Sequence, residues 1–359
     1  MFTDFFAQCN NDHKLVSSSL KELYGINKYS TNIFYGLNLI WPDYDLDHSY
    51  EKYFLSWHTE QLDTHWLIKQ AKAVYPKPIL VANDGMVENS GVWPNNIQFV
   101  RWVTIHKQLK KAISIFGKQN NITKPTFKLS SLAFRYSQYK KFVTAYLLQH
   151  FNNNDIMLTW HNYHGKIEDL HDHPHGFGHL EDLDFEILEQ VHKINFDDNY
   201  QLKDNNPVGN ASWNNQAYND ALVNLTNESF HYSNTMFGYL PFRYPGPYIT
   251  EKTFKPLLAG RPFVMIGQCR SLQMLEEFGF NTNFGWNTEY DSDCGDLTRI
   301  GKIFSTLNEI NSTPLDDLFE QSLPAVQHNL LHVDSDDFID ICEAINGNSK
   351  QVIQDFING

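Results

Sequence analysis

A short segment in the second half of the chain combines residue types that bind a diphosphate. Thr250 is a helix N-cap residue, and Glu251 and Lys252 follow it in the first turn of a helix that we expect to reach Leu258. A helix N-terminus presents free N–H groups and partial positive charge, which suits a phosphate. The Lys252 ammonium adds a full charge, and the Glu251 carboxylate is suited to accept hydrogen bonds from ribose or sugar hydroxyls. These are the groups that a nucleotide-sugar site requires, although three residues alone also fit an ordinary capped helix with a solvated ion pair.

The residues that follow indicate how this segment is positioned. Gly260 and Pro262 end the expected helix. The run Phe263–Ile266 is continuously apolar, which is typical of a buried parallel strand. Ser271 is then expected to cap a further helix. Pro256 lies inside the first helix and removes one of its hydrogen bonds, so we expect a kink there.

Apolar runs alternate with helical patterns along the rest of the chain. Strand-like runs occur at 32–40, 79–82, 155–160 and 221–225, and helical patterns occur at 65–74, 105–116 and 136–150. This alternation predicts an α/β fold with mostly parallel sheets. The break at Ile122–Pro125 predicts a domain boundary. We therefore expect two Rossmann-like domains facing across a cleft, an acceptor-side domain at 1–125 and a second domain at 126–330, followed by a helical tail at 331–359.

The pattern over residues 222–284 resembles the donor-site region of a known enzyme family. The run Tyr-Ile-Thr-Glu-Lys-Thr-Phe (248–254) is followed by Lys-Pro (255–256), Gly-Arg-Pro-Phe (260–263), Ser-Leu-Gln-Met-Leu (271–275) and Gly-Phe (279–280). The run Asn-Glu-Ser (227–229) lies upstream of it. This order is similar to the donor motif of the α1,3-fucosyltransferase family. It is more similar still to fucosyltransferase-like glycosyltransferases that bacteriophages encode. The likeness is weak over 128–150 and is not seen in the first 120 residues.

The resemblance implies a GT-B glycosyltransferase whose second domain holds a nucleotide-sugar donor. The donor-binding residues that it implies are Glu228, Thr250, Glu251 and Lys252. Arg135 is a further candidate, because the phage-like relatives carry an arginine-bearing segment at this place. In such enzymes cationic side chains and a helix dipole stabilise the leaving diphosphate. No metal and no cofactor other than the nucleotide-sugar co-substrate is then expected.

Inversion at the sugar, which the resemblance also implies, needs one general base to take the proton of the acceptor hydroxyl. We expect the first domain to supply it. Asp84 directly follows the strand-like run 79–82, and the carboxyl ends of parallel strands are where α/β proteins place their sites. Glu60 and Glu88 are alternatives. Asp84 fits a turn residue before Gly85 equally well.

A histidine-rich segment follows the strand-like run 155–160. It contains His161, His164, His171, His173, His175 and His179. The spacing matches no standard zinc site, and the surrounding residues are acidic and loop-like. We interpret the segment as a solvated insertion and predict no metal.

Charge is unevenly distributed along the chain of 359 residues, whose net charge is −14. Residues 89–154, called the basic stretch below, contain no Asp or Glu and ten Lys or Arg. A basic stretch with interleaved aromatic residues can bind a polyanion through phosphate contacts and stacking. The candidate contacts are Lys107, Lys110, Lys111, Lys140 and Lys141. The same charges also fit the solvated faces of two helices.

Composition and cysteine spacing limit the class of protein and the cellular compartment that we expect. With 42% hydrophobic and 14% aromatic residues, the chain can bury real cores, which excludes a disordered protein. No apolar run approaches 18 residues, and the first residues contain no secretory pattern. The four cysteines are scattered without a Cys-x-x-Cys, which favours free thiols in a reducing cytoplasm.

Three interpretations of function remain open from the sequence. The first is a cytoplasmic glycosyltransferase, located in the host cytoplasm if viral, whose acceptor is a hydroxyl on a modified base in phage DNA. The second is the same enzyme acting on a surface carbohydrate, such as lipopolysaccharide or capsule. The third is a non-catalytic binding module that keeps the fold.

Overall fold

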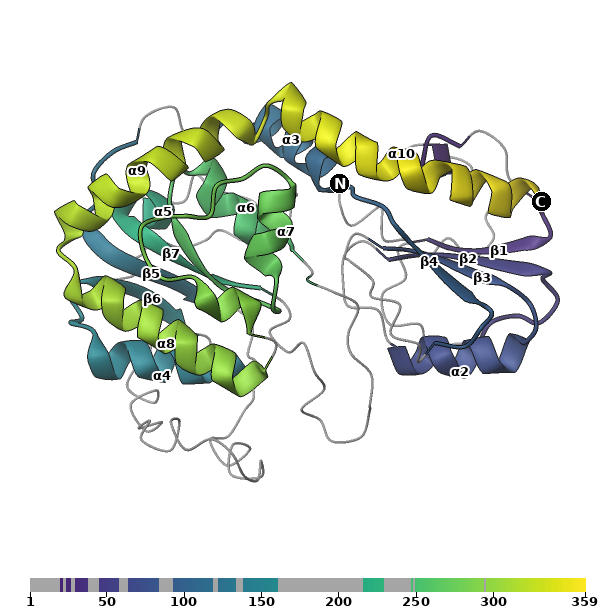
Figure 1. Cartoon of the computed structure of the whole chain (residues 1–359), viewed down its shortest axis with the longest axis horizontal. Helices are drawn as coiled ribbons and strands as arrows, with labels where there is room; N and C mark the ends of the chain where they lie inside the picture. The colour runs from purple at the N-terminus through teal and green to yellow at the C-terminus, as the bar shows by residue number, and fades with distance from the viewer. Residues whose placement is uncertain are drawn as a thin grey trace.

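The computed structural model of the chain contains two parallel sheets that are covered by helices (Figure 1). It describes residues 20–21, 24–26, 30–37, 45–57, 64–83, 93–118, 122–133, 138–160, 216–228, 247, 249–293 and 295–359. Within these residues each sheet has four strands, and every pair of neighbouring strands is parallel. The predicted α/β fold with parallel sheets is therefore confirmed.

The first sheet has its strands in sequence order. These are β1 (Ile33–Leu37), β2 (Lys52–Trp57), β3 (Ile79–Asn83) and β4 (Ile97–Arg101). The helix α2 (Thr64–Val74) connects β2 to β3. All five residues of β3 are buried, as expected for a strand with both of its faces covered.

Side chains of the first sheet alternate between two hydrophobic clusters. On β3, Ile79 and Val81 join the cluster that contains Leu67 and Ala71 of α2. Leu80, which lies between them in sequence, joins the opposite cluster. This is the two-residue period of a strand, and it explains why the run is apolar at every position.

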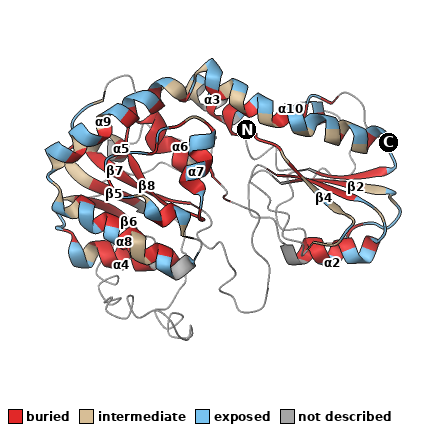
Figure 2. Cartoon of the chain, in the orientation of Figure 1, coloured by how far each residue is buried: buried red, intermediate tan, exposed pale blue. Residues whose placement is uncertain are grey.

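The second sheet has the strand order β6–β5–β7–β8. Its strands are β5 (Phe127–Ala133), β6 (Ile156–Trp160), β7 (Ala221–Asn227) and β8 (Phe263–Ile266). The helices around it are α4 (Gln138–His150), α5 (Gln216–Asp220), α6 (Glu251–Leu258), α7 (Ser271–Glu277), α8 (Asp296–Ser312) and α9 (Leu315–His332), with the 3-10 helix η5 (Glu289–Ser292) before α8. Helices α4 and α8 lie on one face of the sheet, and α6 and α9 lie on the other (Figure 1). The strands between them are buried (Figure 2).

Two helices connect the sheets. The helix α10 (Asp336–Asn358) begins beside the second sheet and runs along the first (Figure 1). Its early residues Phe338 and Cys342 belong to the core of the second sheet, whereas Ile353 and Ile357 belong to a core of the first. The helix α3 (Ile105–Phe116) follows β4 in sequence, but its residue Leu109 also packs in the second core. Both cores therefore depend on residues from both sides of the predicted boundary at 125.

The segment that connects the sheets is held by a buried arginine. Arg261 is 2% exposed, and its Nη1 donates to the carbonyl of Thr123 at 2.7 Å while its Nε donates to the carbonyl of Tyr218 at 2.9 Å. Burial lowers the pKa of this guanidinium to about 10, which leaves it charged at neutral pH. The Gly-Arg-Pro-Phe element thus anchors the second sheet to the segment that connects the two sheets.

Three local expectations have clear outcomes. The helix capped by Thr250 reaches Leu258 with Pro256 inside it, and Gly260 follows with a φ of 64°. Ser271 does not cap α7, because the N-cap is Arg270 in a left-handed conformation and the Ser271 hydroxyl donates to Gln268 O at 2.6 Å. No helix in the described ranges is both long and apolar enough to cross a membrane.

The expectation of free thiols is wrong for one cysteine. Cys269 is disulfide-bonded, and its partner lies outside the described residues. Cys342 is buried and is not part of a disulfide.

Candidate functional site

The strand order of the second sheet places a switch point between β5 and β7. From β5 the chain continues through α4 to β6 on one side, and from β7 it continues through α6 to β8 on the other. Connections that leave two neighbouring parallel strands in opposite directions open a crevice at their carboxyl ends, where α/β proteins bind ligands. The switch point is bordered by the ends of β5 and β7 and by the first turns of α4 and α6.

Glu228, which directly follows β7, connects the elements at this edge through hydrogen bonds. Its carboxylate is fully buried and accepts hydrogen bonds from the Thr250 N–H at 3.1 Å, from the Thr250 hydroxyl at 2.6 Å and from the Thr253 hydroxyl. Its own N–H donates to Ile266 O, the last residue of β8, at 2.9 Å. One residue therefore fixes the first turn of α6 to the ends of two strands.

Lys252 is positioned by this network. The Thr250 hydroxyl oxygen accepts from the Lys252 N–H at 3.3 Å, which is an N-cap hydrogen bond, and from the Lys252 ammonium at 3.2 Å. Lys252 is half-buried. Its charge thus lies at the positive end of α6, where both the ammonium and the helix dipole favour an anion.

The first turn of α4 reaches the same edge. The Tyr139 hydroxyl donates to the backbone carbonyl of Glu228, so α4 contacts the end of β7 directly. The next residue, Lys140, is only 7% exposed, and its ammonium lies 5.9 Å from the centroid of the Tyr139 ring. Lysine is rarely buried to this extent. Lys140 therefore does not lie on a solvated helix face, the alternative that the charge pattern allowed, and its cation lies next to the residue that contacts the end of β7.

A buried amide also lies at the switch point. Asn227, the last residue of β7, donates from Nδ2 to Ser131 Oγ on β5 at 3.2 Å. Its Oδ1 is buried and has no hydrogen-bond partner in the described part of the chain. Buried polar atoms are nearly always paired with protein, water or ligand. An acceptor in this position suits a ligand hydroxyl or N–H group.

The N-terminus of α7 is closed to anions, in contrast to that of α6. The Asp291 carboxylate accepts from the N–H groups of Leu272 at 2.9 Å and Gln273 at 3.0 Å. Burial raises the pKa of this carboxyl to about 6, although these N–H groups act in the opposite direction. A protein carboxylate already occupies the place where a phosphate would bind, so α6 and α4 are the remaining helix starts at this edge for a ligand.

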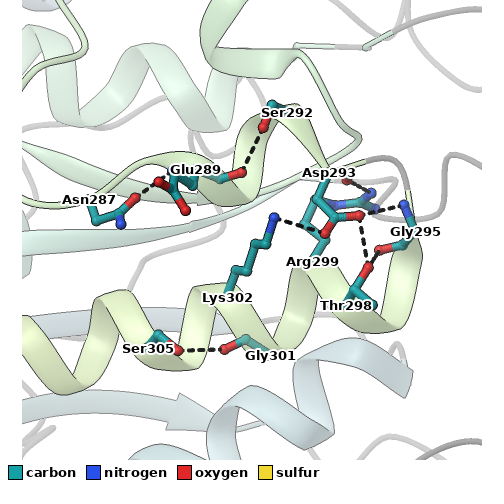
Figure 3. A network of polar contacts seen from close by, with 10 residues as sticks. All are labelled: Asn287, Glu289, Ser292, Asp293, Gly295, Thr298, Arg299, Gly301, Lys302 and Ser305. Atoms are coloured by element: carbon teal, nitrogen blue, oxygen red, sulfur yellow. Dashed lines mark hydrogen bonds and ion pairs between the residues drawn. The ribbon is translucent and has the colours of Figure 1, made fainter.

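The start of α8 is closed in the same way (Figure 3). The Asp293 carboxylate accepts from the Thr298 hydroxyl at 2.7 Å, from the Gly295 N–H at 2.9 Å and from the Lys302 ammonium at 3.1 Å. Burial alone would raise the pKa of Asp293, but these hydrogen bonds outweigh it and the pKa is lowered. We interpret this network as structural.

Several predicted site residues lie outside the described residues. These are Asp84, Glu60, Glu88 and Arg135, together with the side chains of Glu251, Lys111 and Lys141 and the histidine-rich segment 161–179. The strands that precede the two acidic candidates are described. β2 ends at Trp57 and β3 ends at Asn83, and these two residues are partners in the parallel register. Glu60 and Asp84 thus follow neighbouring strand ends.

The basic stretch pairs with the acidic C-terminal helices. Four of its side chains contact carboxylates there: Arg101 with Glu277 at 3.3 Å, Lys107 with Glu343 at 4.0 Å, Lys118 with Asp334, and Lys124 with Asp316. Lys110 is exposed on α3. The uneven charge distribution of the chain is therefore balanced in part within the molecule, which leaves less cationic surface for a polyanion.

The sequence pattern missed three residues of this edge, namely Tyr139, Thr253 and Asn227. Thr253 and Asn227 lie inside the motif, but their contacts depend on the strand order. Among the described residues no group of His, Cys, Asp and Glu is arranged to hold a metal. Comparisons of the chain with protein-family models, with curated proteins and with solved structures gave no match.

Proposed function

We propose that this chain is an inverting glycosyltransferase of the GT-B type. It takes a nucleoside-diphosphate sugar at the switch point between β5 and β7 and transfers the sugar to a hydroxyl acceptor. The acceptor oxygen forms a bond to the anomeric carbon, and the bond from that carbon to the diphosphate breaks. The electron pair leaves with the nucleoside diphosphate, and a general base takes the acceptor proton.

The Glu228 network is the observation that carries the proposal. It holds Thr250 and Lys252 at the end of β7, the position where the strand order opens a crevice. Lys252 and the dipole of α6 oppose the charge that develops on the leaving diphosphate. Lys140, buried next to Tyr139, supplies a second cation that we assign to the same site. The resemblance of this segment to a glycosyltransferase donor motif supports the same assignment.

The remaining contacts to the donor are assigned from the hydrogen-bonding groups of the side chains and from the motif. Asn227 Oδ1 is a buried acceptor without a partner among the described residues, and we assign it to a ribose or sugar hydroxyl. Glu251 and Arg135 keep the donor-binding roles that the motif implies. These cations and N–H groups supply the stabilisation that a metal provides in other transferases, so we expect chelators to leave turnover unchanged.

We assign the general base to the first domain. Glu60 and Asp84 follow in sequence the paired ends of β2 and β3, and the carboxyl ends of parallel strands are where α/β proteins place their sites. We expect Asp84→Asn or Glu60→Gln to abolish transfer while donor binding persists. Full turnover by both variants would reject both candidates.

For the acceptor we favour a carbohydrate hydroxyl, because four basic side chains of the basic stretch are paired with carboxylates. A hydroxyl on a modified DNA base is the second candidate. The exposed side chain of Lys110 on α3 favours it. Duplex binding that weakens steeply with salt would support DNA, and no binding at low salt would remove it.

The test is a panel of GDP- and UDP-sugars that is titrated by calorimetry, followed by mass spectrometry of candidate acceptors. We expect one donor to bind, and we expect Lys252→Met to weaken that binding at least tenfold. Lys72→Met, at an exposed position on α2, is the matched control and should bind as the wild type does. The absence of any nucleotide-sugar binding by the wild type would overturn the proposal, and binding without any transfer or hydrolysis would leave only a binding module.

A further inference from the structure

Arg101, the last residue of β4, extends from the first sheet to the second domain. Its Nη1 donates to Glu277 Oε2 at 3.3 Å at the end of α7, and its guanidinium carbon lies 5.3 Å from the centroid of the Phe278 ring. The side chain is 20% exposed. A cation at the carboxyl edge of one sheet thus contacts a helix that packs on the other.

The rest of the guanidinium is unused. Nε and Nη2 of Arg101 are buried, and neither has a hydrogen-bond partner in the described chain. In arginine these two atoms share one edge, and their N–H bonds point the same way. This edge is the fork that binds both oxygens of a carboxylate or a phosphate. Glu277 uses only Nη1, so both donors of the fork are left for a second oxyanion.

We propose that Arg101 is an oxyanion receptor between the two domains. Its Nε and Nη2 donate to a carboxylate or phosphate group of a ligand. Because both atoms are buried in the present arrangement, the ligand gains access when the Arg101–Glu277 contact opens. Glu277 holds the guanidinium in place and competes with the ligand for its charge. The receptor does not depend on the proposed donor site, and its failure would leave that proposal intact.

The experiment uses inorganic pyrophosphate as the phosphate probe and succinate as the carboxylate probe, each titrated by calorimetry into the full chain. Arg101→Lys keeps the charge but removes the fork, and we expect it to weaken binding of the preferred probe at least tenfold. Glu277→Gln keeps the fork and removes the competing carboxylate, so it should bind that probe as tightly as the wild type or more tightly. Wild-type affinity in Arg101→Lys, or no binding of either probe to the wild type, would overturn the proposal.

A spectroscopic measurement reports on the fork directly. The Arg101 Nε–H resonance is assigned by its loss in Arg101→Lys, and it should shift when the probe binds. No shift at saturating probe would overturn the proposal even if affinities change. Lys252→Met identifies the source of the oxyanion. If the Nε–H response to pyrophosphate persists in this variant, the receptor serves a group other than the donor diphosphate; if the response disappears, the receptor and Lys252 share that diphosphate.

Discussion

Asn346 on α10 closes a ring of two hydrogen bonds on the backbone of Val103. Its Oδ1 accepts from the Val103 N–H at 2.7 Å, and its Nδ2 donates to the Val103 carbonyl at 2.8 Å. Val103 lies between β4 and α3, in the chain that leaves the first sheet. Both residues are buried, so the amide satisfies two backbone groups that water does not reach. A helix near the C-terminus thereby fixes the link that follows the first sheet.

Replacing Asn346 by alanine should destabilise the fold. The change leaves the buried N–H and carbonyl of Val103 without their partners, which costs on the order of 3 kcal/mol in unfolding free energy. Urea denaturation measures this cost. Asn348→Ala, at an exposed position on the same helix, is the control and should stay within about 0.5 kcal/mol of the wild type. Equal stability of the two variants would contradict the role of the ring.

The two threonines that bind Glu228 should differ in their effect on stability. Thr250→Val removes a hydrogen bond to the carboxylate and also the N-cap of α6, so we expect a loss of about 3 kcal/mol. Thr253→Val removes one hydrogen bond to the same carboxylate and should cost about 2 kcal/mol. Thermal and urea unfolding of both variants provide the comparison. A larger loss for Thr253→Val would show that the cap contributes little.

Asp291 should make stability depend on pH. Burial raises the pKa of its carboxyl from 3.8 to about 6, so between these values the folded state binds more protons than the unfolded state. The stabilisation from the protonated form is complete below about pH 4 and is lost as the pH rises through about 6. Asp291→Asn cannot titrate, so the unfolding free energy of the wild type minus that of the variant should fall by roughly 3 kcal/mol between pH 4 and 7.5.

Urea denaturation at the two pH values measures this difference. Asp317→Asn, at an exposed position on α9, is the control variant. If the wild type and Asp291→Asn keep a constant difference in unfolding free energy across this range, the buried carboxyl does not titrate as its surroundings indicate.

Lys140 offers a test that separates binding from folding. Lys140→Met keeps the length of the side chain and removes the charge from a site that is 7% exposed. The variant loses the interactions of the ammonium, but it also no longer has to bury a charge. We therefore expect the unfolding free energy to change by no more than about 1 kcal/mol. Affinity for the nucleoside diphosphate of the donor should fall at least tenfold, as calorimetry would measure, with Lys72→Met as the control. Unchanged affinity would show that Lys140 does not contact the diphosphate and has only a structural role.

The local elements could largely be predicted from the sequence. The apolar runs at 79–82 and 263–266 are β3 and β8, and the helical patterns at 65–74 and 105–116 are α2 and α3. These signals are strong because burial on both faces of a parallel strand, or on one face of a helix, leaves a periodic pattern in the residues themselves. Strands β2, β4 and β5 were not predicted. The strand β5 contains Lys128, Ser130 and Ser131, and its burial arises from neighbours that its own residues do not reveal.

The cap of α6 could be predicted because it is local, since Thr250 and Lys252 lie within one turn. The cap of α7 could not. Ser271 has the right residue type, but the N–H groups of this helix bind Asp291, which lies 20 positions later in the chain. A distant carboxylate that replaces a local cap leaves no spacing that a sequence pattern would detect.

The sequence by itself determined the fold class, the position of the capped start of α6, and the uneven distribution of charge. Those properties depend on neighbouring residues or on composition. The tertiary structure alone decided the strand order, and so which helix starts meet at the switch point. It buried Lys140 next to Tyr139, whose hydroxyl binds Glu228, paired part of the basic stretch with carboxylates of the second half of the chain, and left the fork of Arg101 unused between a strand of the first sheet and a helix of the second. The physical reason is that these relationships join residues from different strands and helices, and only packing brings such residues together.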